Sequence, residues 1–97
     1  MSGILWKKGK KSKAWKSRYF ELRGHFLFYY TKKEVETPNG VFFLDGCYID
    51  ETNDYYQTKK YGFVITHKSP SYEPHYLYCS NKQEFDEWMS HLKLFQR

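Results

Sequence analysis

The hydrophobic spacing of this chain changes once, close to its C-terminus. Up to about residue 80, apolar and aromatic residues fall in short runs separated by turn signals, a pattern typical of short β-strands. Beyond that point the apolar positions are i, i+3, i+4, i+7 and i+10, and they are occupied by Phe85, Trp88, Met89, Leu92 and Phe95. This spacing is that of one face of an amphipathic helix. The change therefore predicts a mainly β domain followed by one C-terminal helix over residues 81–96.

The β part divides into seven runs that we predict to be strands, at 4–8, 15–23, 26–31, 41–44, 47–50, 61–67 and 75–80. Glycine-containing turns separate several of them, at Gly24-His25, Asn39-Gly40 and Asp45-Gly46. The helix can begin in a capping box formed by Ser80 with Gln83 or by Asn81 with Glu84. A helix after seven short strands is expected to cover an open end of a small barrel, so its apolar face is predicted to be core.

Length and composition limit the class of protein. The 97 residues suit one domain spanning 1–97, and an aromatic content of 22% favours a packed core. No run approaches the roughly 20 apolar residues of a membrane helix, so any membrane contact is expected to be peripheral. Cys47 and Cys79 are expected to be reduced thiols, although one disulfide remains an alternative. The four histidines show no metal-ligand spacing, so neither a metal nor a cofactor is predicted.

Positive charge is concentrated near the N-terminus. The net charge is +5, but residues 1–24 contain eight basic residues and one acid, which gives +7. Residues 25–97 contain eight basic residues and ten acids, which gives −2. Such asymmetry indicates a polyanionic partner, which is a nucleic acid, an anionic membrane or a highly phosphorylated small molecule.

Three motifs, taken in order, resemble the pleckstrin-homology family. The opening Gly3-Ile4-Leu5-Trp6-Lys7-Lys8-Gly9 is similar to its first strand, and Trp15-Lys16-Ser17-Arg18-Tyr19-Phe20-Glu21-Leu22 to its second. Trp88 takes the place of the family's helix tryptophan. The resemblance covers essentially the whole chain. It implies two near-orthogonal antiparallel sheets, of four and three strands, that form a barrel capped at one corner by the helix.

The resemblance also implies a binding site. One subset of the family binds phosphoinositides through a basic signature, which is matched here by Lys7, Lys16, Arg18 and Tyr29. Lys7 and Arg18 are eleven residues apart, as are Arg18 and Tyr29, and these spacings are similar to those of members that bind 3-phosphorylated inositol lipids. The chemistry is consistent, because strand alternation places Lys16 and Arg18 on one face and an arginine fork can hold one phosphate through two nitrogens.

Further residues are assigned lesser roles. Lys8, Lys32 and Asn39 are predicted as additional headgroup contacts. Asn39 stands where lipid-binding members often have a basic residue, so the phosphates that are recognised are left open. The loop lysines are expected to attract an anionic membrane surface without specificity, and they are Lys10, Lys11 and Lys13.

These features predict a cytoplasmic, monomeric module of a larger protein. It is expected to bind phosphoinositide lipids or soluble inositol phosphates and to be recruited reversibly to membranes. The alternative is a protein-interaction module of the same fold with weak, non-specific binding to anionic lipid. A nucleic-acid partner is not predicted, because the aromatic residues have core spacing and do not alternate with the basic loop. An enzyme is not predicted, because the chain has no nucleophile elbow or phosphate-binding glycine loop.

Overall fold

The computed structural model describes residues 1–9, 11, 13–52, 61–69 and 71–95. In these parts of the chain, seven strands precede one helix, and every strand lies within two residues of its expected bounds. The helix α1 spans Lys82–Leu92 and continues into a short 3-10 turn at Lys93–Phe95. The strands are β1 (Ser2–Lys8), β2 (Trp15–Arg23), β3 (Phe26–Tyr30), β4 (Gly40–Phe43), β5 (Cys47–Thr52), β6 (Gly62–His67) and β7 (His75–Tyr78).

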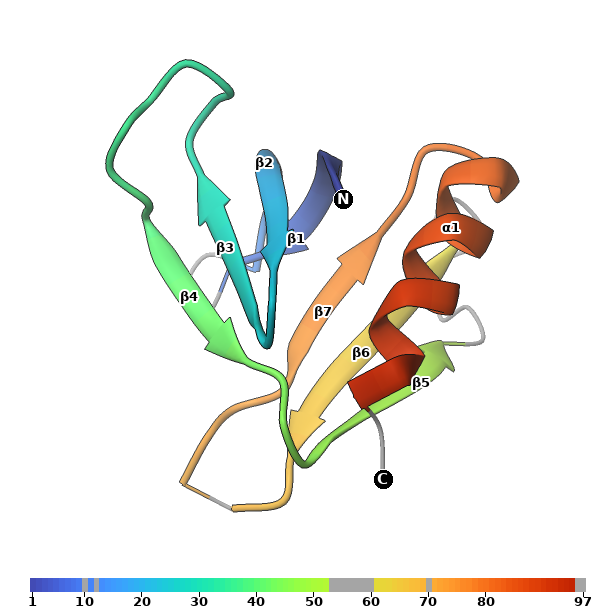
Figure 1. Ribbon diagram of the computed structural model, residues 1–97. Coiled ribbons are helices and arrows are strands. Elements are labelled where there is room, and N and C mark those ends of the chain that lie inside the picture. Colours follow the sequence, from blue (N-terminus) through green and yellow to red (C-terminus); the bar gives the residue numbers. More distant parts are fainter. Residues whose placement is uncertain (10, 12, 53–60, 70, 96–97) are drawn as a thin grey trace.

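The strands form an antiparallel ladder in the order β4-β3-β2-β1-β7-β6-β5. Strands β1 to β4 make one half and β5 to β7 the other, and the two halves cross each other in Figure 1. The predicted fold class is therefore confirmed. The sequence did not indicate that β1 also pairs with β7, at Trp6 with Tyr78 and at Lys7 with Leu77. This short pairing joins the two halves into one continuous sheet.

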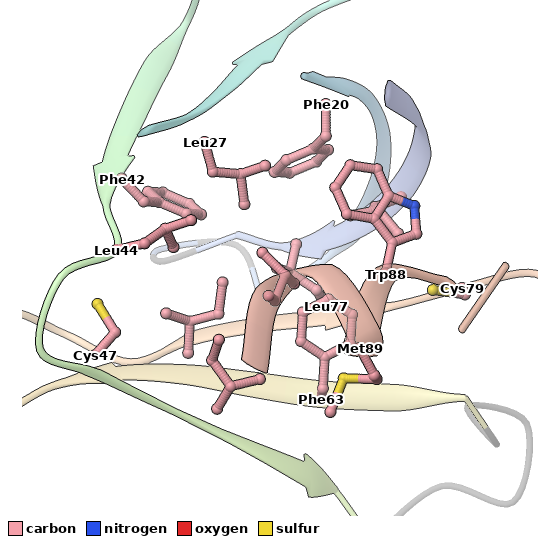
Figure 2. Close-up of a cluster of buried hydrophobic side chains, with 14 residues drawn as sticks. Phe20, Leu27, Phe42, Leu44, Cys47, Phe63, Leu77, Cys79, Trp88 and Met89 are labelled. Atoms are coloured by element: carbon pink, nitrogen blue, oxygen red, sulfur yellow. The ribbon is translucent and has the colours of Figure 1, made fainter. Parts of the chain in front are cut away.

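The core lies between the two halves and the helix, as Figure 2 shows. Helix α1 contributes Trp88, Met89 and Leu92, all of which are buried. The indole of Trp88 packs against β1, since a Cβ on Gly3 would lie 3.7 Å from its Nε1. Phe85, in contrast, is only partly buried at the edge of the core. The predicted apolar face of the helix is thus buried at its centre, at Trp88, Met89 and Leu92, and only partly buried at its edge, at Phe85.

The N-terminus of the helix and the two cysteines answer two questions that the sequence left open. Asn81 is the N-cap, because its Oδ1 accepts a hydrogen bond of 2.9 Å from the backbone N–H of Glu84.

Cys47 and Cys79 are buried and form no disulfide. Burial raises the pKa of the Cys79 thiol to about 12, and the nearby carboxylate of Glu84 adds to the effect. Burial also raises the pKa of Cys47. Both are therefore neutral thiols at pH 7.

Within the described residues, no helix has the length and apolar character needed to cross a membrane. In the same residues, no group of three or more histidine, cysteine, aspartate or glutamate side chains is arranged to hold a metal ion.

Candidate functional site

The β1–β2 hairpin sets the direction of the basic side chains. Lys7 pairs with Lys16 across the two strands, and Leu5 pairs with Arg18. Leu5 and Phe20 are completely buried, so they mark the inner face of the sheet. Because side chains alternate along a strand, Lys7 of β1 and Lys16 and Arg18 of β2 share that inner face. The hairpin therefore carries one continuous face that is apolar in the core and cationic where the core ends.

Tyr29 of β3 lies at the boundary between core and cationic surface. Its ring centroid is 5.5 Å from that of Phe20 and 5.3 Å from that of Phe42, which are the spacings of packed aromatic pairs. Lys7 Nζ also lies 5.5 Å from this centroid, a cation–π geometry. The ring is thus held by the core and orients a lysine, while its hydroxyl remains a polar group at the end of the core.

Gly40 makes room for this tyrosine, a role that was not found from the sequence. The residue was expected in a turn, but it begins β4 and pairs directly with Tyr29. A Cβ on Gly40 would lie 2.5 Å from Tyr29 Cε1 and would collide with the hydroxyl. Only glycine therefore allows the tyrosine ring to lie across β4. A glycine opposite an aromatic residue in neighbouring strands is the signal that could have identified it.

Most of the residues predicted to contact the headgroup line one pocket of about 270 Å³. All four residues of the basic signature line it, and two of the three additional residues do so as well. Among the described residues, the lining is Lys7, Lys8, Gly9, Lys16, Arg18, Tyr29 and Asn39. Lys32 is exposed and does not line the pocket, and neither do Lys11 and Lys13. Lys10 lies outside the described residues.

The polar groups of the pocket are suited to an anion. The described residues of its lining include four cationic side chains and no carboxylate. Arg18 Nη1 donates one hydrogen bond of 2.9 Å, to the backbone carbonyl of Ser17, and so has further donors for a ligand. Asn39 Oδ1 accepts a hydrogen bond of 3.0 Å from Thr31 Oγ1, which leaves its Nδ2 as the group that can donate. The pocket therefore offers many donors to a compact, multiply charged anion.

Comparison with known proteins agrees with this architecture. The family model described as PH domain matches residues 1–97. This chain belongs to the PH-domain family. PH domains are generally non-catalytic modules that commonly bind phosphoinositides or inositol phosphates.

Two curated proteins are similar to this chain over most of its length. The chain is 34% identical over 93 residues to a PH and Rap-GAP domain-containing protein of Dictyostelium discoideum, covering 96% of this chain and 7% of that protein. It is 26% identical over 91 residues to human Sesquipedalian-1, covering 94% of this chain and 35% of that protein. The chain thus spans only a small part of the curated relatives it matches.

Solved structures include PH domains with bound inositol phosphates. The C-terminal PH domain of pleckstrin in complex with D-myo-Ins(1,2,3,5,6)P5 has a TM-score of 0.84 and 27% identity, covering 100% of this chain and 94% of that one. The PH domain of human KIAA0053 protein also has a TM-score of 0.84, with 30% identity, covering 98% of this chain and 86% of that one.

The contact between Gly40 and Tyr29 can be tested directly. Replacing Gly40 with alanine is expected to lower the free energy of unfolding by about 1–3 kcal/mol, because the new methyl group overlaps the tyrosine ring. Urea unfolding measures this loss. In a Tyr29→Ala background the same replacement should cost much less, since the obstacle is gone. An equal cost in both backgrounds would show that the two residues do not compete for this space.

Proposed function

We propose that this PH domain binds the headgroup of 3-phosphorylated inositol lipids in the pocket on β1, β2 and β3, and so brings its host protein to membranes. Lys7, Lys16 and Arg18 are the cationic contacts, and Tyr29 supplies a hydroxyl. The observation that carries the proposal is the pocket itself, because the part of its lining that the structure describes has four cationic side chains and no carboxylate. The inositol pentakisphosphate complexes of the similar pleckstrin domain support the same ligand chemistry.

The strength of binding follows from the donors. The guanidinium of Arg18 can hold one phosphate through two nitrogens, while Lys7 and Lys16 act as point charges on neighbouring phosphates. Charge-assisted hydrogen bonds contribute about 1.5–3 kcal/mol each in net terms. Three or four of them give micromolar or tighter affinity after the costs of association.

The positive charge of the pocket lies on one side, and this affects which inositol phosphate isomers can bind. The cationic groups come from β1 and β2, whereas the opposite side presents the neutral groups Tyr29 and Asn39. We expect two adjacent phosphates, including the 3-phosphate, to face the β1–β2 side. A ring hydroxyl then accepts a hydrogen bond from Asn39 Nδ2.

Calorimetric titration with soluble inositol phosphate isomers tests this function. Isomers with a 3-phosphate and an adjacent phosphate are expected to bind at least about tenfold more tightly than isomers without the 3-phosphate. Vesicles with the matching lipid then distinguish membrane recruitment from binding of the free inositol phosphate. Equal, weak binding of all isomers that disappears with added salt would contradict the proposal and indicate a non-specific basic patch.

A protein partner is the second candidate, and one observation favours it. On the outer face, at the β4 edge, three apolar side chains are exposed, with exposed fractions of 43% for Phe26, 51% for Val41 and 49% for Phe43. The rings of Phe26 and Phe43 lie 5.4 Å apart, so the three residues form a patch. Apolar patches of this kind are typical of protein contact surfaces.

A further inference from the structure

Strand β4 lies at one end of the sheet, and among the described residues no strand pairs with its outer edge (Figure 1). Its other edge pairs with β3, where the N–H of Leu44 donates a hydrogen bond of 2.9 Å to the carbonyl of His25. Hydrogen-bonded pairs alternate along an antiparallel ladder. Counted from Leu44, the backbone groups of Phe42 therefore point toward β3. Those of Val41 and Phe43 point away from it, along what we call the free edge of β4.

The backbone groups on this free edge are spaced as in a strand that has no neighbour. The carbonyl of Phe43 accepts a hydrogen bond of 3.1 Å from Cys47 Sγ, which covers the end of the edge next to the turn into β5. In the part of the chain that the structure describes, the remaining groups of this row are the N–H and carbonyl of Val41 and the N–H of Phe43. Such an edge can pair with one more strand.

A pocket of about 280 Å³ opens along the same edge. Three successive residues of β4 line one side of it, which are Val41, Phe42 and Phe43, and the segment that leads into β7 lines the other with Tyr72 and Glu73. Its volume lies just below the range of about 300–1,000 Å³ that is typical of sites for whole ligands. The pocket therefore suits one large side chain better than a complete small molecule.

The walls of this pocket are mainly aromatic. The ring of Phe42 stacks on that of His75, with centroids 4.0 Å apart and planes inclined by 19°. The rings of His67 and Tyr72 lie 4.7 Å apart, and both line the pocket. Aromatic rings gain most from contact with another ring or with an aliphatic side chain. The side chain that fits is therefore large and apolar.

The charge of this pocket differs from that of the inositol pocket. In the described part of its lining there is one carboxylate, that of Glu73, and no lysine or arginine. Glu73 has another contact in the structure, but a carboxylate accepts hydrogen bonds at several positions. A phosphate or an acidic segment is therefore disfavoured here, whereas a neutral or basic segment is favoured.

A second copy of this chain does not meet these requirements. If the β4 strands of two copies paired, the side chain placed opposite each pocket would be Phe42 of the other copy. Phe42 is only 8% exposed, because its ring packs with Tyr29 and His75 in its own domain. It is therefore not available to fill the pocket of another copy, and a different chain is needed.

We propose that the free edge of β4 binds an extended segment of a partner protein, which adds to the sheet as one more strand and inserts a large apolar side chain into the pocket. Segment residues opposite Val41 and Phe43 form the backbone hydrogen bonds, and their side chains extend the exposed apolar patch. The residue opposite Phe42 enters the pocket, and a basic residue on the same face of the segment approaches Glu73. This inference rests on the second candidate function above, whose partner it specifies, and it does not depend on the inositol site.

A synthetic heptapeptide, Thr-Lys-Val-Phe-Val-Lys-Thr, is the probe. In a strand of either direction, its phenylalanine and lysines share one face and its valines the other. We expect it to bind with a Kd of about 100 µM. An NMR titration should show that the amides of Val41 and Phe43 shift and exchange with solvent about tenfold more slowly once the peptide is bound. No binding at about 1 mM peptide would overturn the inference.

Methylation of the peptide backbone distinguishes strand addition from simple filling of the pocket. N-methylation of the two valines removes the N–H groups that would face β4, and it should weaken binding by at least about tenfold. N-methylation of the phenylalanine is the matched control, because its N–H faces away from β4. This change should alter the affinity by no more than about twofold. Equal affinities of the two methylated peptides would refute pairing with β4.

Variants of the domain give an independent test. Val41→Pro removes a donor from the free edge without removing a hydrogen bond to β3, and it should weaken peptide binding by at least about tenfold, whereas Val41→Thr keeps the N–H and should not. Tyr72→Ala removes one wall of the pocket and leaves β4 unaltered, so we expect a loss of about fivefold. Its control is Tyr48→Ala, at an exposed tyrosine of β5 that does not line the pocket. Unchanged binding in either Val41→Pro or Tyr72→Ala would overturn the inference.

The competing occupant and the inositol proposal can be separated from this one. A dimer of the domain that forms without peptide in sedimentation experiments, and that Val41→Pro abolishes, would mean that the edge takes a second copy and that the peptide assignment is wrong. Tyr72→Ala should leave the titration with soluble inositol phosphate unchanged. Peptide binding without inositol phosphate binding would reject only the inositol proposal, and the reverse result would reject only strand addition.

Discussion

Replacing Arg18 with alanine is expected to weaken binding of a soluble 3-phosphorylated inositol phosphate by about 100-fold or more. In the proposed complex, the replacement removes two charge-assisted hydrogen bonds to one phosphate, and each contributes about 1.5–3 kcal/mol. The fold should lose little, because the hydrogen bond of Arg18 is to the backbone carbonyl of its neighbour Ser17. We therefore expect the melting temperature to stay within about 3 °C of that of the wild-type domain. Isothermal titration calorimetry and a thermal melt give the two quantities.

The same strand provides a matched control in Arg23. Its side chain is 65% exposed, lies 3.5 Å from the Glu21 carboxylate and is absent from the pocket lining. Arg23→Ala changes the net charge by the same amount as Arg18→Ala. We expect Arg23→Ala to change headgroup affinity by no more than about twofold, because it alters only the long-range electrostatic attraction. Equal losses in the two variants would mean that total charge, and not the pocket, determines binding.

Replacing Leu92 with alanine is expected to lower the free energy of unfolding by about 3 kcal/mol. Leu92 is completely buried at the end of α1, where it packs in the core with Trp88 and Met89. The loss combines the transfer free energy of the removed groups with the cost of the cavity that remains. For a domain of this size, it corresponds to a fall in melting temperature of roughly 12–24 °C. Chemical denaturation and differential scanning calorimetry measure both effects.

Leu94, two residues further along, is the control for this prediction. Its exposed fraction is 79%, so the same leucine-to-alanine replacement removes almost no buried surface. We expect the free energy of unfolding to change by no more than about 0.5 kcal/mol. Similar losses at both positions would refute the packing of α1 as the cap of the core.

The fold was largely predictable because its signals are local. The alternation along β2 fixes which residues face inward, and the stripe of Trp88, Met89 and Leu92 fixes the buried face of the helix. The pairing of β1 with β7 was not predictable, because it joins residues about seventy positions apart. The spacing of hydrophobic residues within each strand does not indicate which distant strand it pairs with. The choice of Asn81 over Ser80 as the N-cap also depends on backbone geometry, since both sequences fit a capping box.

The candidate site was predictable to a similar extent. Lys7, Lys16 and Arg18 lie on adjacent strands, so their register brings them together whatever the loops do. Lys32 and Asn39 were named on equal terms, but only Asn39 lines the pocket, because the path between β3 and β4 decides which of them faces it. Glu73 could not be connected with Val41 from the sequence, since a distant segment brings the carboxylate beside β4.

Binding of the inositol headgroup on the inner face of the β1–β2 hairpin can be tested by an NMR titration of the backbone amides with a soluble 3-phosphorylated inositol phosphate. We expect the largest shifts at the pocket residues, which are Lys7, Lys8, Gly9, Lys16, Arg18, Tyr29 and Asn39. Shifts concentrated on the exposed patch of Phe26, Val41 and Phe43, with the hairpin unaffected, would contradict it.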